Sequence, residues 1–236
     1  GPGRLAVAGR EPDAPGAHRM DGRGRAAGMI AAGLGVAALL ASAARAYQVE
    51  AVGEGGAIAG RVRYLGTPPS RGTLAVTKDV AVCGATAKLA TDLVVGPDGG
   101  VRDAVAWLPG ITAGKPFADG VPTLDQRGCE YTPHVLLVPA GRPVTILNPD
   151  GILHNIRTAG QGPEGERNPP VNRAQPKFKT SMTEVFQRPE FIRVGCSVHG
   201  WMQGWIVVQA SPYYAVSDQQ GRFELTDVPA GTYELV

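Results

Sequence analysis

Three side chains that can bind a soft metal ion lie on one short segment near the end of the chain. Cys196, His199 and Met202 follow one another with the spacing C-x-x-H-x-x-M. A second imidazole, His154, comes shortly after an Asn-Pro-Asp-Gly turn at residues 148–151. Two histidines, one cysteine and a weakly held methionine are the ligand set of a blue-copper electron-transfer site. The four residues therefore predict one such copper site.

These ligand types suit a copper ion that changes its charge without changing its surroundings. Thiolate and thioether sulfur favour Cu(I), imidazole suits both oxidation states, and a weak axial methionine tunes the reduction potential. Three ligands on one loop and a fourth at a neighbouring strand let a rigid β-scaffold hold a single arrangement. Hydrogen bonds to the thiolate and a dry surrounding tune the site further. The candidates for this tuning are Asn155, Trp201 and backbone N–H groups near Gly200.

Other chemistries fit the pattern less well. Zinc prefers a closed set of Cys, His and carboxylate ligands, and methionine is a poor ligand for it. A multicopper oxidase or nitrite reductase needs further histidine clusters, but only His134, His154 and His199 follow residue 46. A cysteine protease is disfavoured because its nucleophile pairs with a distant histidine rather than one on the same loop. We therefore expect an electron carrier rather than an enzyme.

The chain has three cysteines, Cys83, Cys129 and Cys196, so one thiol stays unpaired if two form a disulfide. Oxidising compartments outside the cytoplasm favour such pairing. If Cys83 pairs with Cys129, Cys196 remains free, and a metal would hold it as thiolate and protect it from oxidation. A bond between Cys129 and Cys196 satisfies the same count and would exclude the copper site. Both pairings stay open on sequence grounds.

The first 46 residues have the composition of an export leader. Arg23 and Arg25 precede an almost uncharged run at residues 26–44, and an A-x-A pattern closes it at residues 44–46. This order is typical of a secretory signal peptide. A membrane anchor is the alternative, but the run is short for a span and consists largely of Ala and Gly. We therefore expect cleavage at its end, no stable membrane span afterwards, and a periplasmic or extracellular location.

The positive charge of the chain belongs mostly to this leader. Residues 1–46 hold six arginines against three acidic residues, a net charge of +3, whereas the whole chain carries +2, which leaves about −1 for the remainder. This balance does not favour a nucleic-acid partner, which requires a basic face. A basic stretch within residues 167–179 is more typical of a solvated surface than of a docking site.

The residues after the leader predict strands and turns throughout. Gly and Pro are abundant, no long helical period occurs, and short apolar–polar alternations end at turn residues, which favours an all-β fold. Residues 191–194 predict a strand that leads directly to Cys196. Residues 159–179 are rich in Gly, Pro, Asn, Gln and charge and predict a solvated loop. The tail, residues 214–236, has the pattern of a hairpin followed by a further strand.

Three motifs within residues 129–209 carry a resemblance to a known family. They are Leu153-His154-Asn155-Ile156, Cys196-x-x-His199-x-x-Met202, and an opening strand pair that runs from Tyr131-x-Pro133 to Asn148-x-Asp150. Together they resemble the cupredoxins plastocyanin, pseudoazurin and amicyanin. The resemblance implies a Greek-key β-sandwich at residues 119–210. It makes His154, Cys196 and His199 the equatorial copper ligands, Met202 the axial ligand, and Asn155 the side chain that braces the ligand loops.

The flanking parts resemble larger exported bacterial proteins of plastocyanin-like or methylamine-utilisation type. The surroundings of Cys83, the run at residues 129–134 and the tail carry this second resemblance. In those proteins a cupredoxin lies beside a carboxypeptidase-regulatory-like β-module. The resemblance implies a leader at 1–46, a β-rich region at 47–118, and the start of such a module at 211–236, and we expect the natural protein to continue beyond Val236.

The combined prediction is an exported type 1 copper protein that passes one electron between partner proteins. Two other functions stay open. One is a non-redox β-module of the cell envelope, binding carbohydrate or protein, with structural cysteines only. The other is a copper storage or delivery protein. For His134 we favour a packing or surface role over one near the copper.

Overall fold

A computed structural model describes residues 46–162 and 167–236 of the 236-residue chain. The predicted leader at residues 1–46, with its signal peptide, lies outside the described residues apart from its last position. The described part contains eighteen strands and one short helix, α1 (Val80–Cys83). No helix in these two described stretches has the length and apolar character needed to cross a bilayer.

The largest sheet has five strands in the order β10-β16-β15-β12-β13. β10 runs parallel to β16, and the other neighbours are antiparallel. The bounds are β10 (Val135–Pro139), β12 (His154–Gly160), β13 (Asn172–Gln175), β15 (Glu190–Gly195) and β16 (Gln203–Gln209). Because β12 and β15 are antiparallel neighbours, the first residues of β12 lie beside the last residues of β15.

A second sheet has three strands in the order β14-β11-β9. Its bounds are β9 (Thr123–Asp125), β11 (Pro143–Leu147) and β14 (Ser181–Val185). Buried and exposed residues alternate along β14, which is the pattern of a strand with one face on a core. The inward residues of the two sheets form one buried cluster, which includes Val138, Ile146, Ile156, Met182, Ile192 and Ile206.

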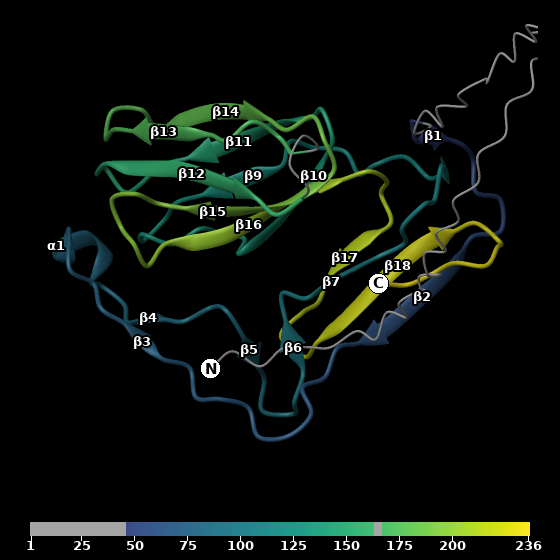
Figure 1. Cartoon of the computed structure of the whole chain (residues 1–236), viewed down its shortest axis with the longest axis horizontal. Helices are drawn as coiled ribbons and strands as arrows, with labels where there is room; N and C mark the ends of the chain where they lie inside the picture. The colour runs from purple at the N-terminus through teal and green to yellow at the C-terminus, as the bar shows by residue number, and fades with distance from the viewer. Residues whose placement is uncertain (1–45, 163–166) are drawn as a thin grey trace, which may run out of the picture. The chain divides into compact units, whose positions relative to one another are not determined.

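These two sheets make a β-sandwich (Figure 1). The chain changes sheet between β9 and β10, β10 and β11, β11 and β12, β13 and β14, and β14 and β15, so most of its connections cross from one sheet to the other. The prediction of an all-β fold with a β-sandwich and additional β-rich flanking segments is therefore confirmed.

The remaining strands form five pairs, β1-β8, β18-β2, β3-β4, β5-β6 and β17-β7. Their bounds are β1 (Gln48–Val49), β2 (Gly56–Arg61), β3 (Thr73–Leu74), β4 (Lys88–Leu89), β5 (Val94–Val95), β6 (Val101–Arg102), β7 (Val105–Trp107), β8 (Ala113–Gly114), β17 (Tyr214–Val216) and β18 (Arg222–Val228). A smaller core of Leu108, Tyr213, Leu225 and Val228 lies among them.

Two local predictions differ from the structure. The tail strands do not pair as a hairpin, because β17 pairs with β7 and β18 runs along β2 (Figure 1). Alternation of side chains indicates a strand but does not identify its partner. The predicted loop at 159–179 contains β13, an edge strand whose first three residues are exposed. A strand without an apolar face has no periodic signal in its sequence.

Candidate metal centre

Two neighbouring strands bring the predicted ligands together. His154 is the first residue of β12, and Cys196 directly follows the last residue of β15. In the ladder between these strands Arg157 faces Gly195, so both residues reach the same end of the sandwich. The loop at residues 196–202 then joins β15 to β16 and carries His199 and Met202.

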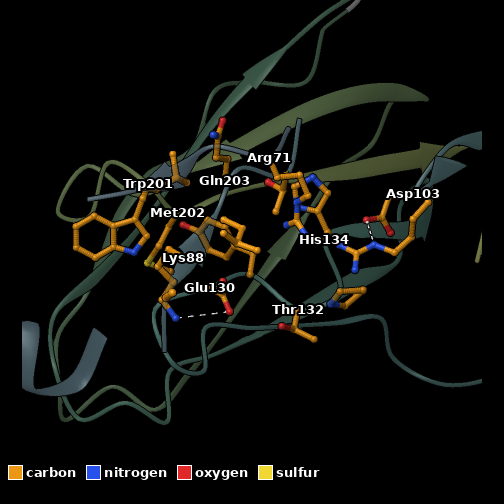
Figure 2. A pocket seen from close by; sticks show the side chains of 16 residues that line it. Arg71, Lys88, Asp103, Glu130, Thr132, His134, Trp201, Met202 and Gln203 are labelled. Atoms are coloured by element: carbon orange, nitrogen blue, oxygen red, sulfur yellow. Dashed lines mark hydrogen bonds and ion pairs between the residues drawn. The ribbon is translucent and has the colours of Figure 1, made fainter. Parts of the chain in front are cut away.

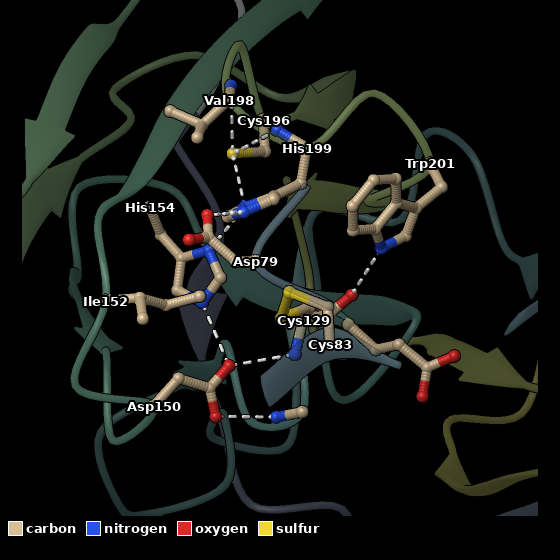
Figure 3. The surroundings of a disulfide bond; sticks show 12 residues. Asp79, Cys83, Cys129, Asp150, Ile152, His154, Cys196, Val198, His199 and Trp201 are labelled. Carbon is tan, nitrogen blue, oxygen red and sulfur yellow. Dashed lines mark hydrogen bonds and ion pairs between the residues drawn. A yellow bond between two sulfur atoms is a disulfide. The ribbon is translucent and has the colours of Figure 1, made fainter. Parts of the chain in front are cut away.

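Three donor atoms converge in the interior at this end. Nitrogen atoms of His154 and His199 and the Sγ atom of Cys196 all lie within 4.8 Å of one another. The two Nδ1 atoms are 3.1 Å apart, and Cys196 Sγ lies 3.8 Å from Nδ1 of His199. Both imidazoles are fully buried and Cys196 is 5% exposed. Figure 3 shows the two rings and the thiol facing one another.

Each imidazole contacts a carboxylate on its outer side. Nε2 of His154 lies 2.9 Å from Oδ2 of Asp150, and Nε2 of His199 lies 2.8 Å from Oδ2 of Asp79. A carboxylate accepts hydrogen bonds, so each neutral ring carries its proton on Nε2 and presents a lone pair at Nδ1. Two such lone pairs 3.1 Å apart repel unless a cation lies between them. The arrangement therefore suits a metal ion bound by both Nδ1 atoms.

The sulfur of Cys196 also accepts hydrogen bonds from the backbone. The N–H groups of Val198 and His199 both donate to it over 3.4 Å. Such bonds stabilise a thiolate, the form of cysteine that binds metals. Burial of His154 lowers its pKa below the usual 6.5, while Asp150 acts in the opposite direction. A lower pKa keeps the ring neutral and able to bind a metal.

Met202 is buried at the end of the same loop. It is 2% exposed, and its N–H donates to the carbonyl oxygen of His199 over 3.0 Å. Its carbonyl oxygen accepts from the N–H of Cys196 over 3.3 Å. Met202 and Cys196 line one cavity. Backbone hydrogen bonds thus close the loop between Cys196 and Met202.

Asn155 and Trp201 both contact the ligand loops. Oδ1 of Asn155 accepts the N–H of Ser197 over 3.2 Å, so it ties β12 to the residue after Cys196. The ring of Trp201 packs on that of His199 with centroids 5.1 Å apart. Its Nε1–H donates to the carbonyl oxygen of Cys129 over 3.2 Å. Both side chains therefore restrain the loop from outside the donor cluster.

The cysteines divide into a pair and one free thiol. Cys83 and Cys129 form a disulfide, and Cys196 remains free and buried. The thiol in the C-x-x-H-x-x-M segment is therefore available to a metal. A second group of metal-binding residue types, Cys129, Asp150 and His154, lies nearby, but the disulfide occupies the sulfur of Cys129.

His134 lies outside the donor cluster. Figure 2 shows it with Met202 and Trp201 on the wall of a cavity of about 500 Å³. Burial lowers its pKa below the usual 6.5. Its carbonyl oxygen accepts the N–H of Trp205 over 2.7 Å, a backbone hydrogen bond at the start of the β10–β16 ladder.

The sequence-based prediction missed two residues of the site, Asp79 and Asp150. Asp150 stands four residues before His154 in the Asn-Pro-Asp-Gly turn, and its closeness in sequence could have indicated a contact with His154. Asp79 is 120 residues from His199, and no local pattern links them. Carboxylates that hold the outer nitrogen of a metal-binding histidine are a common feature of metal sites. The residues present therefore fit a copper ion held by two imidazoles and a thiolate.

No protein-family model and no curated protein sequence matches this chain. Solved structures with a similar fold include a copper-containing nitrite reductase from Thermus scotoductus, at 25% identity over 40% of this chain and 24% of that one, with a TM-score of 0.30. Two amicyanin variants in the Cu(I) form are also similar. One is 25% identical over 45% of this chain and 100% of its own, and the other is 25% identical over 44% and 98%, both with a TM-score of 0.33. The chain thus spans about a quarter of the nitrite reductase and nearly all of amicyanin.

Proposed function

We propose that this protein is a type 1 copper protein that carries one electron at a time. The observation that carries the proposal is the pair of buried imidazoles whose Nδ1 atoms face each other 3.1 Å apart, beside a free thiol. Carboxylates on the outer nitrogens direct both lone pairs inward. Nitrogen and thiolate sulfur together are the donors of blue-copper sites.

The chain's own residues account for the properties that an electron carrier needs. Copper, when bound, supplies the change between Cu(II) and Cu(I). His154 and His199 would hold it through Nδ1, Cys196 through Sγ, and Met202 as a weak axial ligand. The N–H groups of Val198 and His199 stabilise the thiolate. Because both imidazoles are fully buried, the ligands would keep their positions in both oxidation states.

The small number of histidines in the described part of the chain favours an electron carrier over a multicopper enzyme. The donor cluster contains two histidines, and His134 lies apart from it on a cavity wall. We propose that separate donor and acceptor proteins exchange electrons with this one. The disulfide between Cys83 and Cys129 supports a location outside the cytoplasm, in the periplasm or beyond the cell, where disulfides persist.

Voltammetry of the copper-loaded protein tests the proposed function. We expect one reversible one-electron wave, absent in Cys196→Ser and in His154→Ala. Ser197→Ala is the matched control, because it changes an exposed side chain next to the thiol and leaves the backbone N–H in place. A protein that binds Cu(I) tightly but gives no reversible wave would be a storage or delivery protein instead.

A further inference from the structure

We propose that Asp79 is a positioning residue for the metal and that the Cys83–Cys129 disulfide fastens the segment that carries it. The proposal deepens the copper function above and rests on it. Asp79 lies outside the sandwich, in the N-terminal region that precedes the metal-binding strands. It closes the outer edge of His199 and fixes the direction in which that ring presents Nδ1.

Among the residues that the structure describes, Asp79 is the one hydrogen-bond partner of the outer ring nitrogen of His199. Oδ2 of Asp79 lies 2.8 Å from Nε2, and the imidazole is fully buried while the Asp79 side chain is 35% exposed. Asp79 thus lies between the ring and the solvent. The imidazole of His199 cannot rotate about its Cβ–Cγ bond without breaking the hydrogen bond between Nε2 and Asp79. Its Nδ1 atom therefore stays directed at His154.

The backbone of Asp79 directs its carboxylate to the ring instead of to its own helix. Asp79 precedes α1 with φ 49° and ψ 41°, in the left-handed region, and makes no side-chain cap to the helix. Its carbonyl oxygen accepts the N–H groups of Val82 and Cys83. Left-handed residues other than glycine cost free energy and concentrate at functional sites. An aspartate at a helix start normally caps the first turn, so its use for His199 is a departure that points to the metal site.

The disulfide connects this segment to both imidazoles. Cys83 ends α1, four residues after Asp79, and is bonded to Cys129, and both are fully buried. The N–H of Cys129 donates over 2.8 Å to Asp150, the carboxylate that holds His154. The carbonyl oxygen of Cys129 accepts the Nε1–H of Trp201, whose ring packs on His199. Figure 3 shows these contacts around the sulfur–sulfur bond.

One residue, Cys129, therefore supports each imidazole. It reaches His199 through α1 and Asp79, and it reaches His154 through Asp150. The connection between the two outer carboxylates thus consists of the covalent disulfide and the hydrogen bond from Cys129 to Asp150. Preorganised ligands bind a metal more tightly because less motion is lost on binding. Loss of Asp79 should accordingly weaken copper binding and open the site to small reagents.

The test uses the whole chain with Asp79→Ala, Asp79→Asn and the control Asp119→Asn. The control changes the charge of an exposed residue that makes no hydrogen bond or ion pair within the described part of the chain. Copper affinity is measured by competition with a small Cu(I) chelator. We expect Asp79→Ala to lower affinity about 10- to 100-fold, as losses of outer hydrogen bonds to metal ligands do. Asp79→Asn keeps an oxygen acceptor and should lie between Asp79→Ala and the unaltered chain, and Asp119→Asn should match the unaltered chain.

A second measurement needs no metal. Nitrogen-15 NMR of the histidine rings in the copper-free protein should detect the Nε2 proton of His199 protected from solvent, and Asp79→Ala should abolish that protection. Equal affinity and equal protection in Asp79→Ala and the unaltered chain would overturn the proposal. An unaltered chain that binds no copper would instead contradict the proposed function. The ring signal would then still decide whether Asp79 holds His199.

The role of the disulfide is tested with the double variant Cys83→Ser, Cys129→Ser. We expect lower protection of the His199 Nε2 proton, because α1 loses its covalent attachment to the sandwich. Full protection without the disulfide would overturn its role as a fastener. If this double variant does not fold, the Asp79 variants still decide the proposal, since Asp79 is partly exposed and belongs to neither buried core cluster.

Discussion

Asp150 holds the outer nitrogen of His154 at 2.9 Å from within the turn that leads into the same strand. The same carboxylate accepts two backbone N–H groups, from Gly128 over 2.7 Å and from Cys129 over 2.8 Å. Three donors thus meet one side chain that is 7% exposed. The orientation of a candidate metal ligand is therefore coupled to the loop that carries the disulfide.

Replacement of Asp150 by alanine should affect both folding and metal binding. The buried N–H of Cys129 would lose its acceptor, and an unsatisfied buried donor costs about 1 to 3 kcal/mol. We expect the free energy of unfolding of the copper-free protein to fall by that amount and copper affinity to fall about 10- to 100-fold. Urea unfolding and chelator competition measure the two effects. Asp119→Ala is the control, and an Asp150→Ala protein with unchanged copper affinity would contradict the role.

Asn155→Ala should loosen the ligand loop. The variant removes the acceptor for the N–H of Ser197 and the donor to Asn172, each a bond worth about 1 kcal/mol. We expect faster hydrogen exchange at the N–H of Ser197 together with lower stability. Asn168→Ala is a matched control, because Asn168 braces residues 188–190 at the opposite end of β15. Equal exchange at Ser197 in both variants would exclude a specific brace.

Met202→Leu should raise the reduction potential while the thiolate site persists. Leucine keeps the apolar packing but donates nothing to the metal, and the loss of a donor disfavours the more highly charged Cu(II). Soft sulfur favours Cu(I) when it is compared with a harder ligand, whereas here methionine is compared with no ligand at all. Each tenfold loss of relative Cu(II) affinity corresponds to about 59 mV. Voltammetry measures the shift, and Met182→Leu, the same change in the core on β14, should leave the potential unaltered.

The stability of the copper-free protein should fall on acidification, in part through His134. Burial lowers the pKa of His134 in the folded protein below the 6.5 of the unfolded chain, with Asp103 and Asp92 opposing and Arg102 assisting. The unfolded state then binds more protons, so stability is full above about pH 6.5 and is lost as the pH falls toward the folded pKa. Urea unfolding between pH 8 and 5 should show a smaller loss for His134→Gln. His154 contributes in the same direction in both proteins, so the difference in stability between the unaltered chain and His134→Gln reports on His134 alone. Identical dependence of stability on pH in the two proteins would contradict this role of His134.

The sequence could predict those parts of the fold that have a local pattern. The run at residues 191–194 indicated a strand, which is part of β15, and the spacing of Cys196, His199 and Met202 indicated one loop with metal-binding side chains. β13 had no such pattern, because an edge strand with exposed residues buries little. The partners of β17 and β18 depend on residues more than 100 positions away, which periodicity cannot reveal.

The outer part of the candidate site was least accessible to sequence analysis. Asp79 acts through a left-handed backbone conformation and a contact across 120 residues, and both arise only from the folded chain. The pairing of Cys83 with Cys129 was one of two open alternatives, since counting thiols cannot separate them. The structure joins these two and leaves Cys196 free. The domain boundaries at residues 118 and 210 stay predictions.

The visible absorption spectrum after addition of Cu(II) tests the central claim most directly. A thiolate bound to Cu(II) gives an intense charge-transfer band in the red region. The account predicts this band in the unaltered chain, its loss in Cys196→Ser, and its retention in Ser197→Ala. A colourless protein whose Cys196 remains a free thiol after Cu(II) addition would contradict the copper site and favour a non-redox β-module.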